Sequence, residues 1–301
     1  MNKFTYIGLV LGTTLIMGLA FPVGKIGLTY APPFFLMGLR FTLAGALLAV
    51  IARMIGKPRP RGRNQWLQAS AIGLFQSAGV MGCAYYSMRW ITSGESSIIT
   101  CTNPLIVILL STVFGGAAYR GRQWLGVAVG IVGVAFSFGL HLGLQPGTFI
   151  GLAGAFSFAA ATLLIKRWGA GFDMTALAAY QMLAGGMMLL VLSLMTEHPY
   201  FAFTGTSVLV TLWLALVCSI VQFMLWFYLL RRGDPAKTSS FLFLVPVFGV
   251  ISSWLLLGER VQWYVGVGGA FICAGIFLVN WEGKGRPART AAIQGAKEAG
   301  A

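Results

Sequence analysis

Two stretches of this sequence decide its fold: YYSMRWITSGESSIITCTNP at residues 85–104 and FYLLRRGDPAKTSSFLFLVP at residues 227–246. Aligned at this separation of 142 residues, several identical residues coincide: Tyr86 with Tyr228, Arg89 with Arg231, Ser97 with Ser239 and Pro104 with Pro246. Further pairs recur at nearly the same separation: Trp124 with Trp263, Lys25 with Lys166 and Arg40 with Gln181. The steady offset predicts a duplicated chain with halves near 1–143 and 144–282. Residues 283–301, rich in Gly, Ala and charge, are expected to form a disordered cytoplasmic tail.

The composition places both halves in a membrane. Hydrophobic residues make up 57% of the chain and charged residues only 9%, and the mean hydropathy is +0.82, values typical of membrane proteins and not of soluble domains. A helix needs about 20 apolar residues to cross a bilayer. Ten such runs are present: 5–28, 34–52, 66–88, 94–115, 123–140, 148–166, 174–195, 206–230, 238–257 and 262–280. We therefore predict an all-α membrane protein with ten transmembrane helices.

The net charge of +14 follows the predicted topology. If both termini are cytoplasmic, the Lys and Arg residues fall in the tails or cytoplasmic loops, with four exceptions: Lys25, Arg40, Arg89 and Arg260. This is the distribution that the positive-inside rule describes, and attraction to anionic lipid accounts for the surplus charge. We expect a multi-pass protein of the bacterial cytoplasmic membrane, monomeric or homodimeric, that contacts membrane lipid and no nucleic acid.

Each half contains five predicted spans, and an odd number forces the second half to enter the membrane in the opposite direction. The prediction is therefore two inverted five-helix repeats, an arrangement found in secondary transporters whose site lies between the repeats. A duplication that only builds a stable bundle is the alternative. Spans 5 and 10 also contain small residues that predict close packing seams: Gly126 and Gly130 in span 5, and Gly266, Ala270 and Ala274 in span 10.

Span 4 concentrates polar residues. Four of them lie three or four residues apart and so share one helix face: Ser93, Ser96, Thr100 and Asn103. In lipid, such a face must contact protein or water. Pro104 is expected to distort the helix near Thr100, and Pro246 to do the same in span 9. Distorted helices in corresponding positions indicate a binding site, and bonding of the hydroxyl groups to their own helix is the alternative.

Charged residues near the predicted outer side are candidates for coupling or gating. A buried carboxylate has a raised pKa unless it is paired, as proton coupling requires, so Glu95 is a candidate gate with protons as the coupling ion. Its alternative is a structural role, as a partner of Arg40 or Arg89 or as a residue of the interface. Arg40 lies deep enough to need a partner, either a structural carboxylate or an anionic substrate group. Lys25 is expected to be interfacial.

Amide and aromatic side chains complete the predicted substrate site. Rings bind the apolar part of an amphipathic solute and amide groups bind its polar part. The expected substrate-binding residues are Gln76, Tyr86, Ser96, Thr100, Asn103, Phe156, Gln222, Trp226 and Phe243, with Phe21 and Ser219 as further candidates. The four cysteines lie inside predicted spans and are interpreted as packing residues. No cofactor or metal is expected.

Two quoted stretches carry a family resemblance. GERVQWYVGVGGAFICAGI at 258–276, with the ten spans and the repeat, resembles the EamA-type branch of the drug/metabolite transporter superfamily. MGLAFPVGKIGL…PPFFLMGLRF at 17–41 is similar to the family's first-span signature. There are two departures: Met17 stands where a Trp is usual, and Arg120 replaces the acid that the second half keeps as Glu259. The resemblance implies a central cavity lined by spans 1, 3, 4, 6, 8 and 9, with spans 5 and 10 peripheral.

The absence of two sequence motifs argues against two classes of function. The chain contains no HExxH metalloprotease motif and no GxxxxGK[ST] nucleotide-binding motif, so an enzyme or a primary pump is not expected. We expect a secondary transporter that exports a small amphipathic organic metabolite, amino-acid-like or drug-like, by alternating access. A lipid scramblase or channel-like facilitator is the alternative, distinguished by transport that neither saturates nor shows counterflow.

Overall fold

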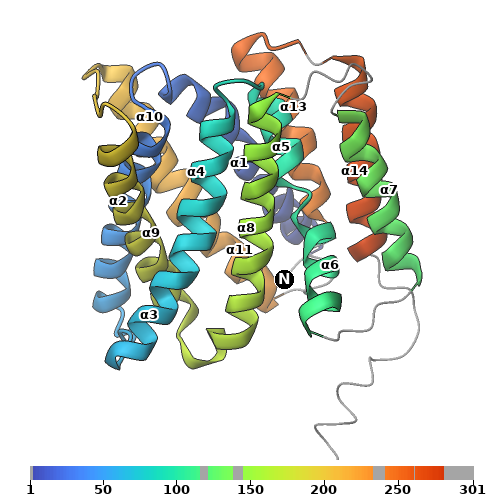
Figure 1. Ribbon diagram of the computed structural model, residues 1–301. Coiled ribbons are helices and arrows are strands. Elements are labelled where there is room, and N and C mark those ends of the chain that lie inside the picture. Colours follow the sequence, from blue (N-terminus) through green and yellow to red (C-terminus); the bar gives the residue numbers. More distant parts are fainter. Residues whose placement is uncertain (1–2, 116–120, 138–144, 233–240, 261, 281–301) are drawn as a thin grey trace, which may run out of the picture.

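A computed structural model describes residues 3–115, 121–137, 145–232, 241–260 and 262–280 (Figure 1). All regular structure in these ranges is helical. Six segments are long and apolar enough to cross a membrane: Phe4–Gly27, Pro33–Met54, Ser93–Leu110, Pro146–Gly171, Met174–Thr196 and Gly205–Trp226. Three shorter apolar helices are Gly121–Phe136, Leu244–Leu257 and Trp263–Val279. The all-α prediction is confirmed, and the number of ten spans stays a prediction. The expected tail, 283–301, lies outside the described residues.

The helices follow one another in this order: α1 (Lys3–Gly27), α2 (Pro33–Met54), α3 (Gly62–Gly73), α4 (Val80–Ser87), α5 (Ser93–Thr100), α6 (Asn103–Gly115), α7 (Gly121–Ser137), α8 (Pro146–Trp168), α9 (Met174–Thr196), α10 (Gly205–Ala215), α11 (Gln222–Arg232), α13 (Leu244–Leu257) and α14 (Trp263–Asn280). Two π-helices, η1 (Leu74–Gly79) and η3 (Leu216–Val221), join α3 to α4 and α10 to α11. Two 3₁₀ helices, η2 (Gly169–Gly171) and η4 (Phe241–Phe243), follow α8 and precede α13.

Helices α2 and α9 pack side by side and run in opposite directions. At one end, Glu197 beyond α9 accepts hydrogen bonds from the amides of Phe34 and Phe35, at 3.1 and 3.2 Å, where α2 begins. At the other end, Lys57 beyond α2 contacts Asp173, the N-cap of α9, at 2.9 Å. Each helix therefore receives a carboxylate at its N-terminus, which its unpaired amides and its dipole favour.

Helices α7 and α14 form a pair at the edge of the bundle (Figure 1), as the family resemblance implied. A Cβ on Gly126 would lie 2.8 Å from the carbonyl oxygen of Gly275, and one on Gly275 would lie 2.6 Å from that of Gly126. The two backbones therefore touch, which only glycine permits. The predicted seam on α14 is wrong, since its three residues are exposed: Gly266, Ala270 and Ala274.

Span 4 is divided into two helices. Helix α5 ends at Thr100 and α6 begins at Asn103. Pro104 has no amide hydrogen to donate to the carbonyl of Thr100, so the helix breaks where the sequence predicts a distortion. Pro246 does not lie at a helix break. It lies in the first turn of α13, just after η4 continues into this helix. The distortion in span 9 is thus a change of helix type and not a break.

The largest buried apolar cluster lies between α1, α2, α4, α9 and α10. Its bulkiest members come from all five helices: Phe21, Leu36, Met37, Phe41, Tyr85, Met182, Leu189 and Leu214. Phe21 is only 4% exposed, so this ring packs in the core, and its role in lining a substrate cavity stays a prediction.

Candidate functional site

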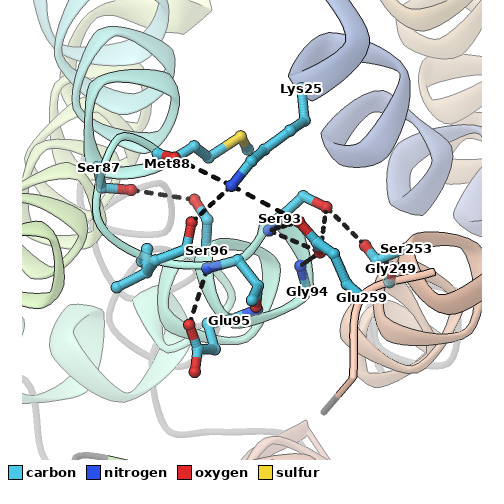
Figure 2. Close-up of polar contacts among 12 residues, drawn as sticks. Lys25, Ser87, Met88, Ser93, Gly94, Glu95, Ser96, Gly249, Ser253 and Glu259 are labelled. Carbon is cyan, nitrogen blue, oxygen red and sulfur yellow. Dashed lines mark hydrogen bonds and ion pairs between the residues drawn. The ribbon is translucent and has the colours of Figure 1, made fainter. Parts of the chain in front are cut away.

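The end of the bundle at which α1 ends and α2 begins, opposite the N-terminus, is called the far end here; it is uppermost in Figure 1. Polar contacts there join the two halves of the chain at the start of α5 (Figure 2). Glu259, from the connection between α13 and α14, accepts hydrogen bonds from the amides of Ser93 and Gly94 at 3.0 and 3.4 Å. The Ser93 hydroxyl also donates to Glu259, at 2.8 Å. A carboxylate of the second half thus caps a helix of the first.

Lys25 brings α1 into the same contacts. Its Nζ lies 3.5 Å from Glu259 Oε1 and donates to the carbonyl oxygens of Met88 and Ile91, at 3.0 and 2.9 Å. The cation therefore sits at the C-terminal end of α4 while the anion sits at the N-terminal end of α5, as the two helix dipoles favour. Lys25, Ser93, Gly94 and Glu259 are called the far-end cluster below.

Glu95, the predicted gate, has a local partner. Its carboxylate accepts a hydrogen bond from the amide of Thr92 at 2.8 Å, and Thr92 Oγ1 accepts one from the amide of Glu95 at 3.1 Å. This reciprocal pair is a capping box. With Glu259, it gives a partner to each amide from residue 92 to residue 95, the groups that a helix start leaves unpaired. Neither Arg40 nor Arg89 forms an ion pair with Glu95 in the described part of the chain.

Arg40 lies in the core and is 2% exposed. Its Nε donates to Ser219 Oγ at 2.9 Å and its Nη2 to the carbonyl oxygen of Cys218 at 2.7 Å, both in η3. Its Nη1 donates to Tyr85 Oη at 3.3 Å, and that hydroxyl donates to the carbonyl oxygen of Ala20. A structural carboxylate was one of the two partners expected for Arg40, and no carboxylate forms an ion pair with it in the described part of the chain. Among the described residues, neutral oxygens surround its charge.

The same contact occurs in the other half without a charge. Gln181, which aligns with Arg40 at an offset of 141, accepts a hydrogen bond from Ser77 Oγ at 2.8 Å. Ser77 aligns with Ser219 at an offset of 142, and it lies in the other π-helix, η1. An arginine–serine pair and a glutamine–serine pair therefore occupy equivalent places in the two halves.

The polar face predicted for span 4 contacts several neighbours. Ser96 donates to the carbonyl oxygen of Ala84 in α4 at 3.0 Å and lies 3.3 Å from Ser87 Oγ, so it joins α5 to α4 (Figure 2). Thr100 Oγ1 is buried and has no hydrogen-bond partner in the described structure. Asn103 is half-buried at the first residue of α6. Thr100 is thus the residue of this face whose hydroxyl is unsatisfied.

The remaining predicted site residues differ in exposure. Gln76 in η1 and Gln222 and Trp226 in α11 are half-buried. Tyr86 is also half-buried and stacks on Phe34, with ring centroids 4.9 Å apart. Phe156 on α8 is 50% exposed. The side chain of Phe243 lies outside the described residues.

The end of the bundle near the N-terminus, where α2 ends and α9 begins, contains a second ion pair. Burial alone would raise the pKa of Asp173, but hydrogen bonds from Lys57 Nζ and from the amides of Ala176 and Thr175 outweigh it and hold the pKa below its usual value. Residues 233–240, which belong to the connection after α11, are outside the described residues. The described part contains no group of three or more side chains suited to hold a metal ion.

Comparison with known proteins agrees with this architecture. The model of the EamA-like transporter family matches the chain twice, at residues 4–139 and 145–281, so the domain is duplicated. The transporter YoaV of Bacillus subtilis is 28% identical over 89% of this chain and 94% of its own length. A protein of Streptantibioticus cattleyicolor named "Probable terminal-alkyne amino-acid exporter" is 29% identical over 91% of this chain and 93% of its own.

A solved crystal structure shares the fold, with a TM-score of 0.66 and 18% identity, over 90% of this chain and 97% of that chain. The relatives are named as transporters, which are not enzymes, so the prediction of a non-enzyme is confirmed by family. The chain belongs to the EamA-like transporter family and is a multi-pass membrane transporter built on a duplicated domain.

Proposed function

We propose that this chain is a secondary transporter that moves a small amphipathic organic metabolite across the cytoplasmic membrane by alternating access between two inverted five-helix repeats. The observation that carries the proposal is the exchange of contacts between halves. Arg40 in the first half bonds to Ser219 in the second, and Gln181 in the second bonds to Ser77 in the first. Two copies related by an axis in the membrane plane make contacts of this reciprocal kind.

The antiparallel packing of α2 and α9 supports the same relation. The N-terminus of α2 is capped by Glu197 at the far end, and that of α9 by Asp173 at the opposite end. If both termini are cytoplasmic, as the distribution of Lys and Arg favours, the far end is the outer side of the membrane. The far-end cluster then closes the outer side.

The opposite end lacks the charges for an equivalent closure. The residue equivalent to Lys25 is Lys166, which is exposed in the last turn of α8. The residue in the place of Glu259 is Arg120, which lies outside the described residues. In the sequence, the two positions equivalent to Lys25 and Glu259 therefore both hold cations. We therefore propose that the resting transporter is closed to the outside and opens first to the cytoplasm, as an exporter should.

The proposed substrate is amino-acid-like or drug-like. Support comes from the relative named as an exporter of a terminal-alkyne amino acid and from the half-buried amide and indole groups of Gln222 and Trp226. Such groups suit a solute with one polar and one apolar part. Protons are the proposed coupling ion.

Counterflow in proteoliposomes tests the function. Vesicles loaded with unlabelled amino acid should accumulate labelled amino acid transiently, with a saturable initial rate. Flux that neither saturates nor shows counterflow would indicate a channel-like facilitator or a lipid scramblase. Topology is tested separately: single cysteines at positions 60 and 144 should be labelled from opposite sides of the membrane, and labelling from one side would refute the inverted repeat.

A further inference from the structure

Two π-helices occupy equivalent places in the two halves of the chain. η1 covers Leu74–Gly79 and η3 covers Leu216–Val221, so each residue of η3 lies 142 residues after its counterpart. This is the separation of the repeated stretches 85–104 and 227–246. A π-helix replaces the i→i+4 bonds of an α-helix by i→i+5 bonds, is rare, and is frequent at functional sites. Its occurrence in both halves calls for a physical cause.

Side chains of the opposite half contact both π-helices. Ser219 Oγ accepts a bond from Arg40 and donates to the carbonyl oxygen of Leu214, five residues earlier, at 2.9 Å. Arg40 also donates to the carbonyl oxygen of Cys218. The guanidinium therefore binds one hydroxyl and one carbonyl oxygen of the same π turn. In the other half, among the described residues, the neutral Gln181 side chain forms one hydrogen bond with its π turn, to Ser77.

Burial makes the contact of Arg40 with η3 strong. Arg40 is 2% exposed, and no carboxylate forms an ion pair with it in the described ranges. Its charge is compensated by the oxygens of Cys218, Ser219 and Tyr85. Hydrogen bonds from an ionised donor are stronger than neutral ones, and stronger still in a low-dielectric interior. The π form of η3 supplies two of these three acceptors.

We propose that Arg40 is a positioning residue, which holds η3 in its π form and thereby sets the rotation of α11 about its axis. A π turn contains one residue more than an α turn. Conversion of η3 to α-helix would therefore rotate the segment after it by about 100° and shift it by about 1.5 Å. Gln222 and Trp226 lie in that segment, one turn apart. Arg40 thus determines which way these two predicted substrate-binding residues face, an inference that deepens the proposed function and depends on it for its consequence in transport.

A nitroxide scan tests the rotation. In a variant without the four native cysteines, single spin labels at positions 223 to 229 give oxygen-collision rates that vary with the period of a helix. Arg40→Leu, which removes every hydrogen bond from this residue to η3, should reduce the ratio of π to α form about 100-fold, the effect of losing charged bonds to two acceptors. The maximum of the collision profile should then move by one residue, or about 100°.

The matched control is Gln181→Ala, which removes the corresponding contact of η1. It should move the profile of labels at positions 81 to 87 and leave that of 223 to 229 unchanged. An unchanged phase in folded Arg40→Leu would overturn the inference. If that variant does not fold, Ser219→Ala takes its place: it removes one of the two acceptors that η3 offers to Arg40, so it should move the phase in the same direction, and an unchanged phase would overturn the inference. The scan needs no substrate, so a shifted phase in a protein without counterflow would count against the proposed function and not against the role of Arg40.

Discussion

Removal of the Glu259 carboxylate should open the far end of the transporter. In Glu259→Ala, the amides of Ser93 and Gly94 lose their acceptor and Lys25 loses its anion. Loss of a helix cap costs about 1 kcal/mol, and loss of a negative charge at a helix N-terminus about 0.5 kcal/mol more. The ion pair adds about 0.5 to 1 kcal/mol, because the Lys25 side chain is 30% exposed and water screens it.

The sum is about 2 to 2.5 kcal/mol, so the ratio of open to closed far end should rise about 30- to 60-fold if the cluster forms only in the closed state. Ser97 is a suitable reporter. It is fully buried, and its Oγ packs against Gly249 of α13. In a variant without native cysteines, Ser97→Cys should react with a membrane-impermeant thiol reagent from outside about 30- to 60-fold faster when Glu259 is replaced.

Glu197→Ala is the matched control, since it removes two amide bonds of the same kind at the far end, at the start of α2. It should lower the melting temperature to a similar extent and leave the labelling rate of Ser97→Cys unchanged. Equal labelling rates in wild type and Glu259→Ala, together with a lower melting temperature, would refute the proposal that the far-end cluster closes the outer side. The cluster would then have a purely structural role.

Five further variants, one of them a control, test single side chains. Glu95→Gln keeps the capping box. If Glu95 is the proton-sensitive gate predicted from the sequence, this variant should lose the pH dependence of transport while substrate exchange persists; identical pH profiles would leave it a helix cap. Thr100→Val removes an unsatisfied buried hydroxyl, so it should raise the free energy of unfolding by about 1 kcal/mol, yet it should reduce transport. The control Thr42→Val removes the other unsatisfied buried hydroxyl and should stabilise the protein without reducing transport. Gln222→Ala should weaken ligand-induced thermal stabilisation in a protein that still folds; normal stabilisation would exclude it from the site. The pKa of Asp173 is lowered on folding, so its contribution to stability is present above about pH 4 and is lost as pH falls through the folded pKa. Asp173→Asn keeps a good N-cap residue but cannot titrate, so its melting temperature should change less with pH in this range. A pH dependence equal to that of the wild type would contradict this assignment.

The sequence predicted the features that depend on composition and on the repeat. Hydropathy indicated the apolar helices, and the offset of 142 residues predicted the duplication that the family match confirms. It did not indicate the face on which α14 packs, because small residues occur around the whole helix. The side of contact depends on which glycine meets another backbone, here Gly275 against Gly126.

The site was predicted only in part. The spacing of Thr92 and Glu95 is a capping-box signal that is visible in the sequence. The N-terminal cap of α5 could therefore have been predicted from it. The role of Glu259 was not predictable, since its partners Ser93 and Gly94 are 166 and 165 residues away. The π-helices left no trace in LFQSAG or LVCSIV, whose residues suit an α-helix equally well. If the inference above holds, the choice between the two helix types depends on tertiary contacts, from Gln181 for η1 and from Arg40 for η3.

The caps that cross between the halves have a consequence for biosynthesis. Helix α2 leaves the ribosome early, but the carboxylate that binds the amide of Phe34 follows 163 residues later. At about 5 to 20 residues per second, the amides at the start of α2 remain bonded to water for roughly 8 to 33 s, and those of Ser93 wait equally long for Glu259. The first half can therefore insert in the membrane on its own but reaches its final helix ends only after the second half has been synthesised. Translation rate and membrane insertion of the second half thus set the time at which the first half is complete.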